Sequence, residues 1–154
     1  MGAGHALPRG IVTLTTDFGY ADAYVGVVKG VMLSINPDLA LVDLTHAVPP
    51  QDVAHGAFVL GTAYRHFPTD AVHLAVVDPG VGTTRRALLL LTPHGRFVAP
   101  DNGVLSFILR DSGILDTAPS TTPFLAPLEC PVPADFQAYA LTNQDFWRHP
   151  VSRT

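Results

Sequence analysis

The apolar positions of this chain alternate between short β-rich runs and longer stretches with helical spacing. Residues 11–15 (IVTLT) lead into the polar, glycine-containing segment 16–19, which predicts a buried strand followed by a loop. Residues 23–35 repeat apolar side chains every three or four positions, with Asp22 as N-cap and Asn36 and Pro37 as the stop, which predicts a helix. A second such unit follows, with a strand at residues 39–44 and a helix from Asp52 to about residue 66, before a third strand at residues 71–77.

Strands that alternate with helices favour parallel pairing and right-handed crossovers. After Asp78 the pattern changes, because two β-like runs, residues 87–92 and 97–99, are separated only by residues 93–96. This spacing predicts a hairpin, and a short helical pattern follows from Asp101 to residue 109. We therefore expect an α/β fold with a mixed, mainly parallel central sheet and helices on both faces.

The C-terminal part has a different composition. Residues 118–133 hold five of the 14 prolines, a spacing through which neither a helix nor a sheet runs. The last pattern, residues 136–147, is too short for a second domain. We predict an α/β domain over residues 1–117 and a proline-rich segment over residues 118–154.

Composition excludes several classes of partner. With 154 residues, 47% of them hydrophobic, the chain can bury the core of one domain. A formal charge of -4 argues against nucleic acid, and the longest apolar runs are far shorter than the roughly 20 residues that cross a bilayer. The first ten residues lack the apolar stretch of a secretion signal, and the single cysteine, Cys130, suits a reducing compartment. We expect a cytoplasmic protein with no nucleic-acid or membrane partner.

Three carboxylates, Asp17, Asp43 and Asp78, lie at or near the ends of the three predicted strands. The carboxyl ends of parallel strands line one edge of a sheet, where ligands bind, so we expect the three acids to converge. The alternative is that such residues only form turns and cap helices. Asp43 is the weakest candidate because it lies within its strand pattern, and the nearby His46 could be a core histidine.

Residues 78–85 (DPGVGTTR) form a glycine-rich connection with Asp78 at one end and Arg85 at the other. Glycines allow the backbone to approach a ligand or to form a nest of amides. The connection lacks the Lys-Ser/Thr ending of a phosphate loop, and no dinucleotide fingerprint follows a strand. The alternative reading is a tight turn that leaves Arg85 and Arg86 in solvent.

Four strings, LTTDFGYADAYVGVVKGVMLSINP, VDLTHAVPPQDV, VVDPGVGTTRR and FVAPDNGVLS, follow one another in this order. Together they closely resemble the S-adenosylmethionine (SAM) hydroxide adenosyltransferases, relatives of the SAM-dependent fluorinase and chlorinase. The resemblance covers about residues 11–109 and implies an N-terminal α/β domain joined to a C-terminal β-barrel domain. It also implies homotrimers that bind SAM between subunits. The 154 residues contain no such barrel, so we interpret them as the N-terminal part of a longer protein.

The resemblance also assigns roles to individual positions. Asp17, followed by Phe18, matches the acid that binds the ribose hydroxyls, and a carboxylate suits that role because it accepts O–H bonds. Asp78 and Arg85 match two members of an Asp-Arg-His set that holds the attacking water. Asn102 matches a polar position beside the site.

Gln51 stands where the fluorinase has a tryptophan near the sugar, so the resemblance places Gln51, like Phe18, among the substrate-binding residues. Asp78 stands where the fluorinase has a tyrosine. The turn at residues 93–96 replaces a longer insertion in the halogenases, so water rather than halide is the implied nucleophile. The histidine that completes the water-holding set belongs to a Phe-His-Gly-Arg-Asp string that the chain does not reach.

The implied reaction is hydrolysis of SAM to adenosine and methionine by attack of water at ribose C5′, with SAM as substrate and with no other cofactor and no metal. We expect the 154 residues alone to have little or no activity. Two other classes stay open. A metal-dependent phosphoesterase would gather six residues around cations, namely Asp17, Asp43, Asp78, Asp101, Asn102 and His46. A binding module would hold SAM or adenosine without turnover.

Overall fold

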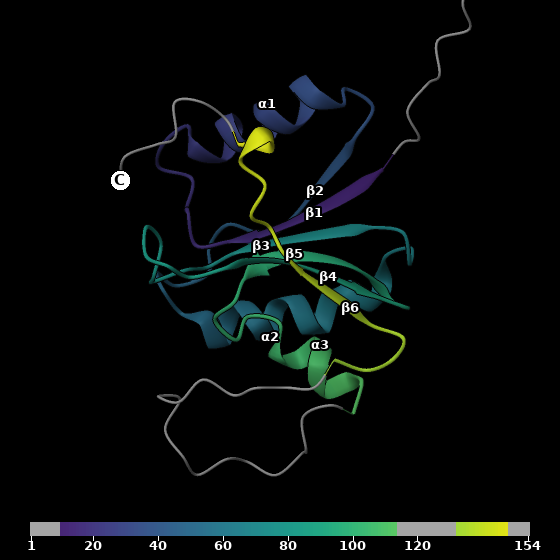
Figure 1. Cartoon of the computed structure of the whole chain (residues 1–154). Coiled ribbons are helices and arrows are strands. Elements are labelled where there is room, and N and C mark those ends of the chain that lie inside the picture. Colours follow the sequence, from purple (N-terminus) through teal and green to yellow (C-terminus); the bar gives the residue numbers. More distant parts are fainter. Residues whose placement is uncertain (1–9, 114–131, 148–154) are drawn as a thin grey trace, which may run out of the picture.

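In the computed structural model, which describes residues 10–113 and 132–147, six strands form one sheet in the order β2-β1-β3-β5-β4-β6 (Figure 1). The strands are β1 (Ile11–Thr16), β2 (Ala40–Thr45), β3 (Val72–Val76), β4 (Ala87–Thr92), β5 (Gly95–Pro100) and β6 (Gln137–Ala140). The helices are α1 (Tyr24–Ile35), α2 (Val53–Ala63) and α3 (Ser106–Asp111), with short 3-10 turns η1 (Tyr64–His66) and η2 (Gln144–Phe146).

The sheet is mixed and mainly parallel, as the sequence predicted. β1 pairs in parallel with β2 and β3, and β3 pairs in parallel with β5. β4 runs antiparallel to both β5 and β6. The carboxyl ends of β1, β2, β3 and β5 therefore lie at the same edge of the sheet.

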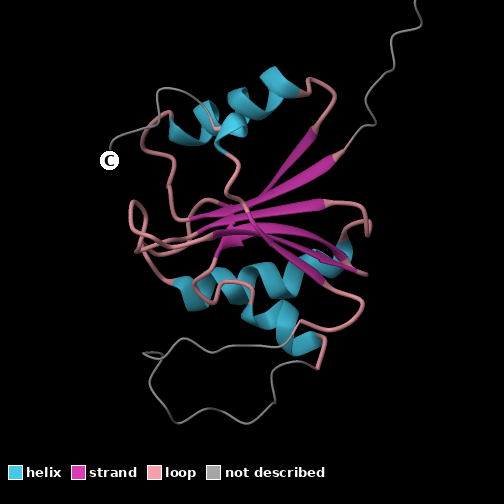
Figure 2. Ribbon diagram, viewed as in Figure 1, coloured by secondary structure: helices cyan, strands magenta, loops and turns pink. Residues whose placement is uncertain are grey.

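Helices cover both faces of this sheet, with α1 on one face and α2 and α3 on the other (Figures 1 and 2). The main core lies between the sheet and the α2 side, where Leu60, Tyr64 and Ile108 meet Ala75 and Phe97. On the opposite side, Val25 is the buried residue of α1. The expected arrangement of helices on both faces is confirmed.

The local signals predict most element ends correctly. Asp52 caps α2, and its Oδ1 accepts a hydrogen bond from the His55 amide at 2.9 Å. Asp22 lies one residue before the cap position of α1, and it accepts instead from the Tyr24 amide at 2.8 Å. In the part of the chain that the structure describes, no helix has both the length and the apolar character needed to cross a membrane.

The C-terminal segment contributes to the sheet. β6 pairs with β4, and the preceding Phe136 packs into the main core. The segment after residue 117 is therefore more than a connection. Residues 118–131, which hold most of the proline-rich stretch and Cys130, lie outside the described residues, and the predicted boundary at residue 117 stays a prediction.

Candidate active site at the carboxyl edge of the sheet

The predicted site residues follow neighbouring parallel strands. Thr16 and Val76 are the last register partners of β1 and β3, so Asp17 lies one residue and Asp78 two residues beyond the same pair. Neighbouring strands run about 4.8 Å apart. β5, parallel to β3 on its other side, is followed directly by Asp101 and Asn102. The loops after these three strands form one edge of the domain.

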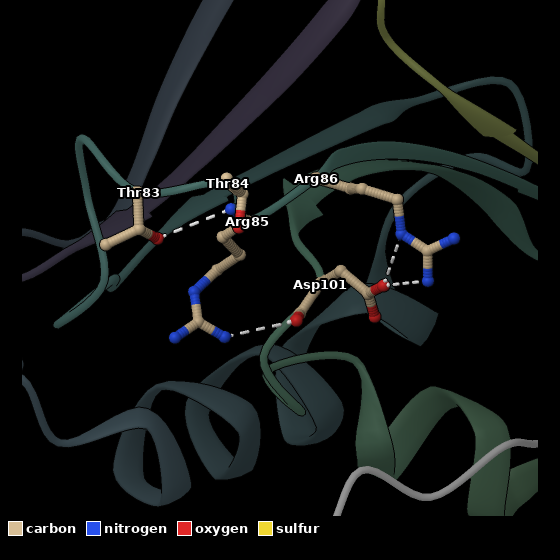
Figure 3. Close-up of a pocket in the computed structure, with 5 residues that line it drawn as sticks. All are labelled: Thr83, Thr84, Arg85, Arg86 and Asp101. Atoms are coloured by element: carbon tan, nitrogen blue, oxygen red, sulfur yellow. Dashed lines mark hydrogen bonds and ion pairs between the residues drawn. The ribbon is translucent and has the colours of Figure 1, made fainter.

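A pocket of about 310 Å³ opens at this edge and is lined by Thr83, Thr84, Arg85, Arg86 and Asp101 (Figure 3). Arg86 donates to Asp101 Oδ2 from Nε at 3.0 Å and from Nη2 at 2.6 Å. The Arg86 side chain is 68% exposed, as the alternative interpretation of a turn with solvent-exposed arginines predicts. Arg85 behaves differently, because its guanidinium points toward the protein.

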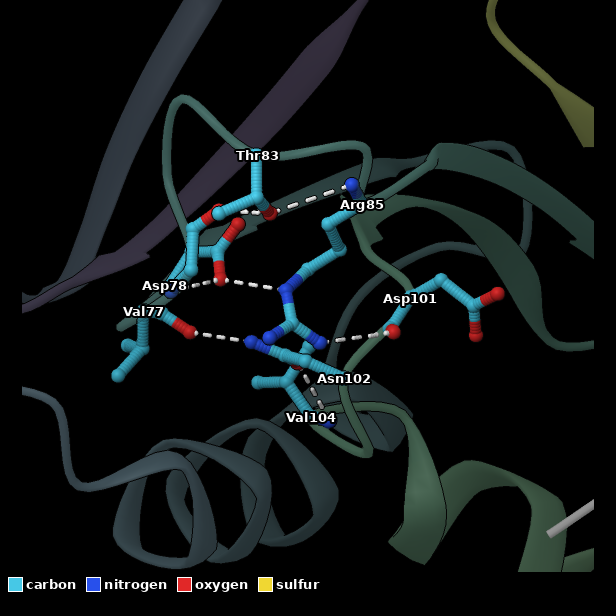
Figure 4. Close-up of polar contacts among 8 residues, drawn as sticks. Val77, Asp78, Thr83, Arg85, Asp101, Asn102 and Val104 are labelled. Atoms are coloured by element: carbon cyan, nitrogen blue, oxygen red, sulfur yellow. Dashed lines mark hydrogen bonds and ion pairs between the residues drawn. The ribbon is translucent and has the colours of Figure 1, made fainter. Parts of the chain in front are cut away.

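Asp78 and Arg85 form an ion pair beside this pocket (Figure 4). Arg85 Nε lies 2.9 Å from Asp78 Oδ1, and the two side chains are only 31% and 12% exposed. The Gly80 amide donates to the same oxygen at 2.8 Å. Both hydrogen bonds that the described residues make to this carboxylate use Oδ1, which leaves Oδ2 for another partner.

Hydrogen bonds within the loop between Asp78 and Arg85 fix its conformation. Thr83 Oγ1 donates to the Gly80 carbonyl at 2.6 Å and accepts from the Arg85 amide at 3.3 Å. Gly80 packs against the guanidinium so closely that a Cβ atom there would lie 2.7 Å from Arg85 Nε. A larger residue at position 80 would therefore push the guanidinium out of its observed place, a constraint that the sequence pattern did not indicate.

Asn102 ties the loop after β5 to the end of β3. Its Nδ2 donates to the Val77 carbonyl at 2.7 Å, and its Oδ1 accepts from the Val104 amide at 3.1 Å (Figure 4). Arg85 Nη1 donates to the backbone carbonyl of Asp101 at 3.2 Å. Asn102 thus fixes the loop that supports Arg85, which agrees with a position beside the site.

Asp17 is held by the backbone of Gln51. The Gln51 amide donates to Asp17 Oδ2 at 2.8 Å, and Gln51 has a φ of 65°, a left-handed conformation that residues other than glycine rarely adopt. The sequence placed the Gln51 side chain near the sugar, whereas the contact to Asp17 is made by its main chain. Phe18 follows Asp17 in the chain, and its ring is edge-on to the ring of Tyr24 with 4.8 Å between the ring centroids.

Asp43 does not join Asp17 and Asp78, so the expected convergence of three acids is wrong. Asp43 pairs in register with Leu14 inside the sheet, and its carboxylate contacts Lys29 Nζ at 2.6 Å and His46 Nε2 at 3.0 Å. Burial acts to raise the pKa of Asp43, but hydrogen bonds and charge from Lys29 and His46 outweigh it and hold the pKa below its ordinary value. The carboxylate faces α1 rather than the edge.

The described residues show no group of three or more His, Cys, Asp or Glu side chains that could hold a metal ion. Asp43, which a metal site would need, is already paired with the Lys29 ammonium. At the edge, Asp17 and Asp78 each have one oxygen bound by the protein, and a third carboxylate, Asp101, is paired with Arg86.

Comparison with known proteins gives a family model and several relatives. The model of the SAM hydroxide adenosyltransferase N-terminal domain matches residues 12–123. A curated (R)-S-adenosyl-L-methionine hydrolase from Salinispora tropica is 42% identical over 147 residues, which cover 96% of this chain and 48% of that protein. A fluorinase from Nocardia brasiliensis is 30% identical over 142 residues, covering 77% of this chain and 47% of that protein.

A solved structure gives the same result for the fold. The crystal structure of an uncharacterized conserved protein from Thermotoga maritima superposes with a TM-score of 0.63 at 45% identity. That match covers 66% of this chain and 39% of the other. The chain spans about half the length of the curated relatives it matches, and less in some alignments.

Proposed function

Because this chain belongs to the SAM hydroxide adenosyltransferase family, we propose that it supplies one wall of a site that hydrolyses SAM to adenosine and methionine. The observation that carries the proposal is the pair of carboxylates at one edge of the sheet. Asp17 follows β1, and Asp78, paired with Arg85, follows the adjacent β3. One carboxylate would hold the sugar and the other the water.

The reaction is a displacement at ribose C5′. The water oxygen forms a bond to C5′ while the bond from C5′ to sulfur breaks, and the electron pair stays on sulfur. Because the sulfonium leaves as the neutral thioether of methionine, the leaving group needs no acid. The protein must orient the water and accept its proton, help that is typically worth about 100- to 10,000-fold in rate.

Asp78 is suited to this task by its free oxygen. Oδ1 is held by Gly80 and Arg85, so Oδ2 would accept the hydrogen bond and then the proton of the water, which passes on to solvent. Arg85 would hold the carboxylate in place through the ion pair. A negative charge here disfavours a halide nucleophile by Coulomb repulsion, which supports water in its place.

Asp17 would bind the ribose through Oδ1, because Oδ2 already accepts from Gln51. Hydroxyl groups donate readily to a carboxylate, and such charge-assisted bonds are shorter and stronger than neutral ones. We propose that Phe18 flanks the sugar next to Asp17. Gln51 and Asn102 would act through the backbone and loop positions that they fix.

The proposal extends to the partners and the location of the whole protein. Adenosine would be the second product, and the assembly a homotrimer, as in the family that the sequence resembles. The formal charge of -4 supports the absence of a nucleic-acid partner. A single cysteine supports a reducing, cytoplasmic location.

The test uses the complete gene product that contains these 154 residues. Incubation with SAM should release adenosine and methionine in equal amounts, at a rate that EDTA does not change. S-Adenosylhomocysteine is the matched control, because its neutral sulfur would have to leave as a thiolate, and it should not be cleaved. Activity that EDTA abolishes would support a metal-dependent enzyme, and SAM binding without methionine release would support a binding module.

A further inference from the structure

A buried histidine lies directly beneath the loop that carries Asp17. His46, one residue after β2, has a side chain that is only 1% exposed. Its Nδ1 lies 2.8 Å from Thr16 Oγ1, at the end of β1. Its Nε2 lies 3.0 Å from Asp43 Oδ1, and Asp43 Oδ2 accepts from Lys29 Nζ at 2.6 Å. A continuous series of polar contacts therefore runs from α1, through β2, to the end of β1.

The last two members of this series hold the loop of residues 17–19 from both sides. Thr16 Oγ1 accepts a hydrogen bond from the Phe18 amide at 3.3 Å. The Gly19 amide donates to the backbone carbonyl of His46 at 2.7 Å. Asp17 lies between Thr16 and Phe18, which the first of these bonds joins, and the second bond holds the next residue to His46. The position of His46 therefore affects the path of the backbone that carries Asp17.

One arrangement of hydrogens satisfies both the Thr16 hydroxyl and His46 Nδ1. Thr16 Oγ1 accepts from the Phe18 amide, and its own hydrogen is free to be donated to His46 Nδ1. The ring hydrogen then resides on Nε2, which lies 3.0 Å from Asp43 Oδ1 and is attracted to that carboxylate by its charge, without the geometry of a hydrogen bond. The Lys29 ammonium keeps that carboxylate in contact with α1. Each member orients the next, and the last orients the Asp17 loop.

The same sheet offers a matched pair without these connections. Thr13 Oγ1 lies 2.8 Å from His73 Nδ1, and both side chains are fully buried. His73 lies among aromatic rings, stacked on Phe97 at 5.0 Å between ring centroids and edge-on to Phe67 at 5.8 Å. Nε2 of His73 and Nε2 of His46 both lack a hydrogen bond of good geometry among the residues described, but His46 Nε2 lies 3.0 Å from the Asp43 carboxylate, whereas His73 Nε2 lies among the rings. This second pair stabilises the core and touches no site loop.

We infer that His46 is a positioning residue, which Lys29 and Asp43 orient so that it and Thr16 present Asp17 Oδ1 to the ribose. The inference rests on the proposed function for the nature of the ligand. It predicts that a substitution that removes the Thr16–His46 contact weakens nucleoside binding more than it slows the chemical step. A purely structural role would lower stability without this selectivity.

The experiment compares Thr16→Val with Thr13→Val in the complete gene product. Each substitution removes one buried hydroxyl that faces a histidine at the same distance. Thr16→Val should raise the Kd for adenosine and the KM for SAM about tenfold, within the range for one lost buried hydrogen bond, with kcat changed less than about threefold. Thr13→Val should leave the Kd for adenosine and the KM for SAM unchanged. The two variants should lower the melting temperature by similar amounts.

Two His46 variants provide the rescue test. His46→Asn places an amide near the position of Nδ1 and should keep most of the adenosine affinity, whereas His46→Leu should lose as much affinity as Thr16→Val. Equal effects of Thr16→Val and Thr13→Val on adenosine binding, or a fall in kcat with an unchanged KM, would overturn the inference. An unmodified protein that binds neither SAM nor adenosine would instead overturn the proposed function.

Discussion

The middle and the carboxyl end of β1 carry the same pair of side chains in two different surroundings. Thr16 with His46 and Thr13 with His73 are both buried threonine–histidine contacts of 2.8 Å. The first pair lies next to the ionised side chains of Asp43 and Lys29 and beneath a site loop. The second pair lies among aromatic rings in the core. The difference shows that neighbours, rather than residue type or distance, decide what a buried histidine does.

The two threonine–histidine pairs also differ in their electrostatic surroundings. Burial lowers the pKa of His73 to about 4, so its ring is neutral near pH 7 and behaves as part of the apolar core. Beside the Thr16–His46 pair, burial acts to raise the pKa of Asp43, but Lys29 and His46 hold that pKa below its ordinary value. The Thr13–His73 pair therefore has neutral surroundings and contributes to the core, whereas the Thr16–His46 pair lies against the charged side chains of Asp43 and Lys29.

The largest expected effect is at the carboxyl end, on turnover. Asp78→Asn keeps the shape of the side chain but removes its capacity to accept a proton, so kcat should fall about 100- to 10,000-fold with adenosine binding retained. Asp17→Ala should instead weaken adenosine binding by roughly 1.5–3 kcal/mol, the usual loss for a charge-assisted hydrogen bond. Calorimetry and steady-state kinetics separate the two. Identical behaviour of the two variants would remove the assigned division of roles.

The next effect is at the Thr13–His73 pair in the core, on stability. The pKa of His73 is about 4 in the folded state and about 6.5 in an unfolded chain. The unfolded state therefore binds a proton first as pH falls, and the stability present above pH 6.5 declines toward pH 4. The full loss is about 3 kcal/mol, which urea unfolding at several pH values would measure.

His73→Leu is the control for this titration, because it removes the buried ionisable ring. The variant should lose the decline in stability between pH 6.5 and 4. The contribution of Asp43 falls in a different window, because its folded pKa is lowered from 3.8, so its stabilisation is lost only as pH falls below about that value. A decline between pH 6.5 and 4 that persists in His73→Leu would assign the effect to another group.

A smaller loss of activity is expected from a change that removes no functional group. Gly80→Ala would place a methyl group against the Arg85 guanidinium, displace it from Asp78 and lower kcat by about 10- to 100-fold, equivalent to one weakened charge-assisted hydrogen bond. Gly30→Ala on α1, where a Cβ meets open space, is the matched control. It should keep full activity and gain about 0.5–1 kcal/mol in stability. Equal kcat values for Gly80→Ala and Gly30→Ala would show that Arg85 can shift and keep its ion pair with Asp78.

Local patterns in the sequence predicted most of the fold but not its long-range contacts. Helical spacing, the Asp52 cap and the hairpin are properties of neighbouring residues, and the structure agrees with them. β6 was missed because its four residues, Gln137–Ala140, are all exposed and show no alternation of apolar and polar positions. Asp43 was misplaced because the register of β2 against β1, which no local pattern reveals, decides how far each residue lies from the edge.

The site was predictable to a similar degree. Asp17, Asp78 and Arg85 lie in strings that carry the family resemblance, and the structure places all three at the carboxyl edge. The contribution of His46 depends on a contact to Thr16 across 30 positions of the chain. Only the strand order reveals it. A histidine in an otherwise apolar stretch gives no signal of such a contact.

The smallest expected effect concerns Gln51, whose backbone rather than side chain holds Asp17. A left-handed residue other than glycine costs about 1 kcal/mol or more, whereas glycine adopts this conformation freely but has more entropy to lose on folding. Gln51→Gly should therefore change the free energy of unfolding by less than about 1 kcal/mol, in the stabilising direction.

Adenosine binding should stay within about twofold in this variant, because glycine retains the amide that donates to Asp17 Oδ2, and a twofold change is only about 0.4 kcal/mol. Gln51→Ala is the control, since it removes the same side chain but keeps the strained backbone. It should bind adenosine equally well and gain no stability. If both variants lost affinity about tenfold, the Gln51 side chain would itself contact the ligand, as the tryptophan at this position in the fluorinase led us to expect. If only Gln51→Gly lost affinity, the strained backbone would be what keeps Asp17 in place.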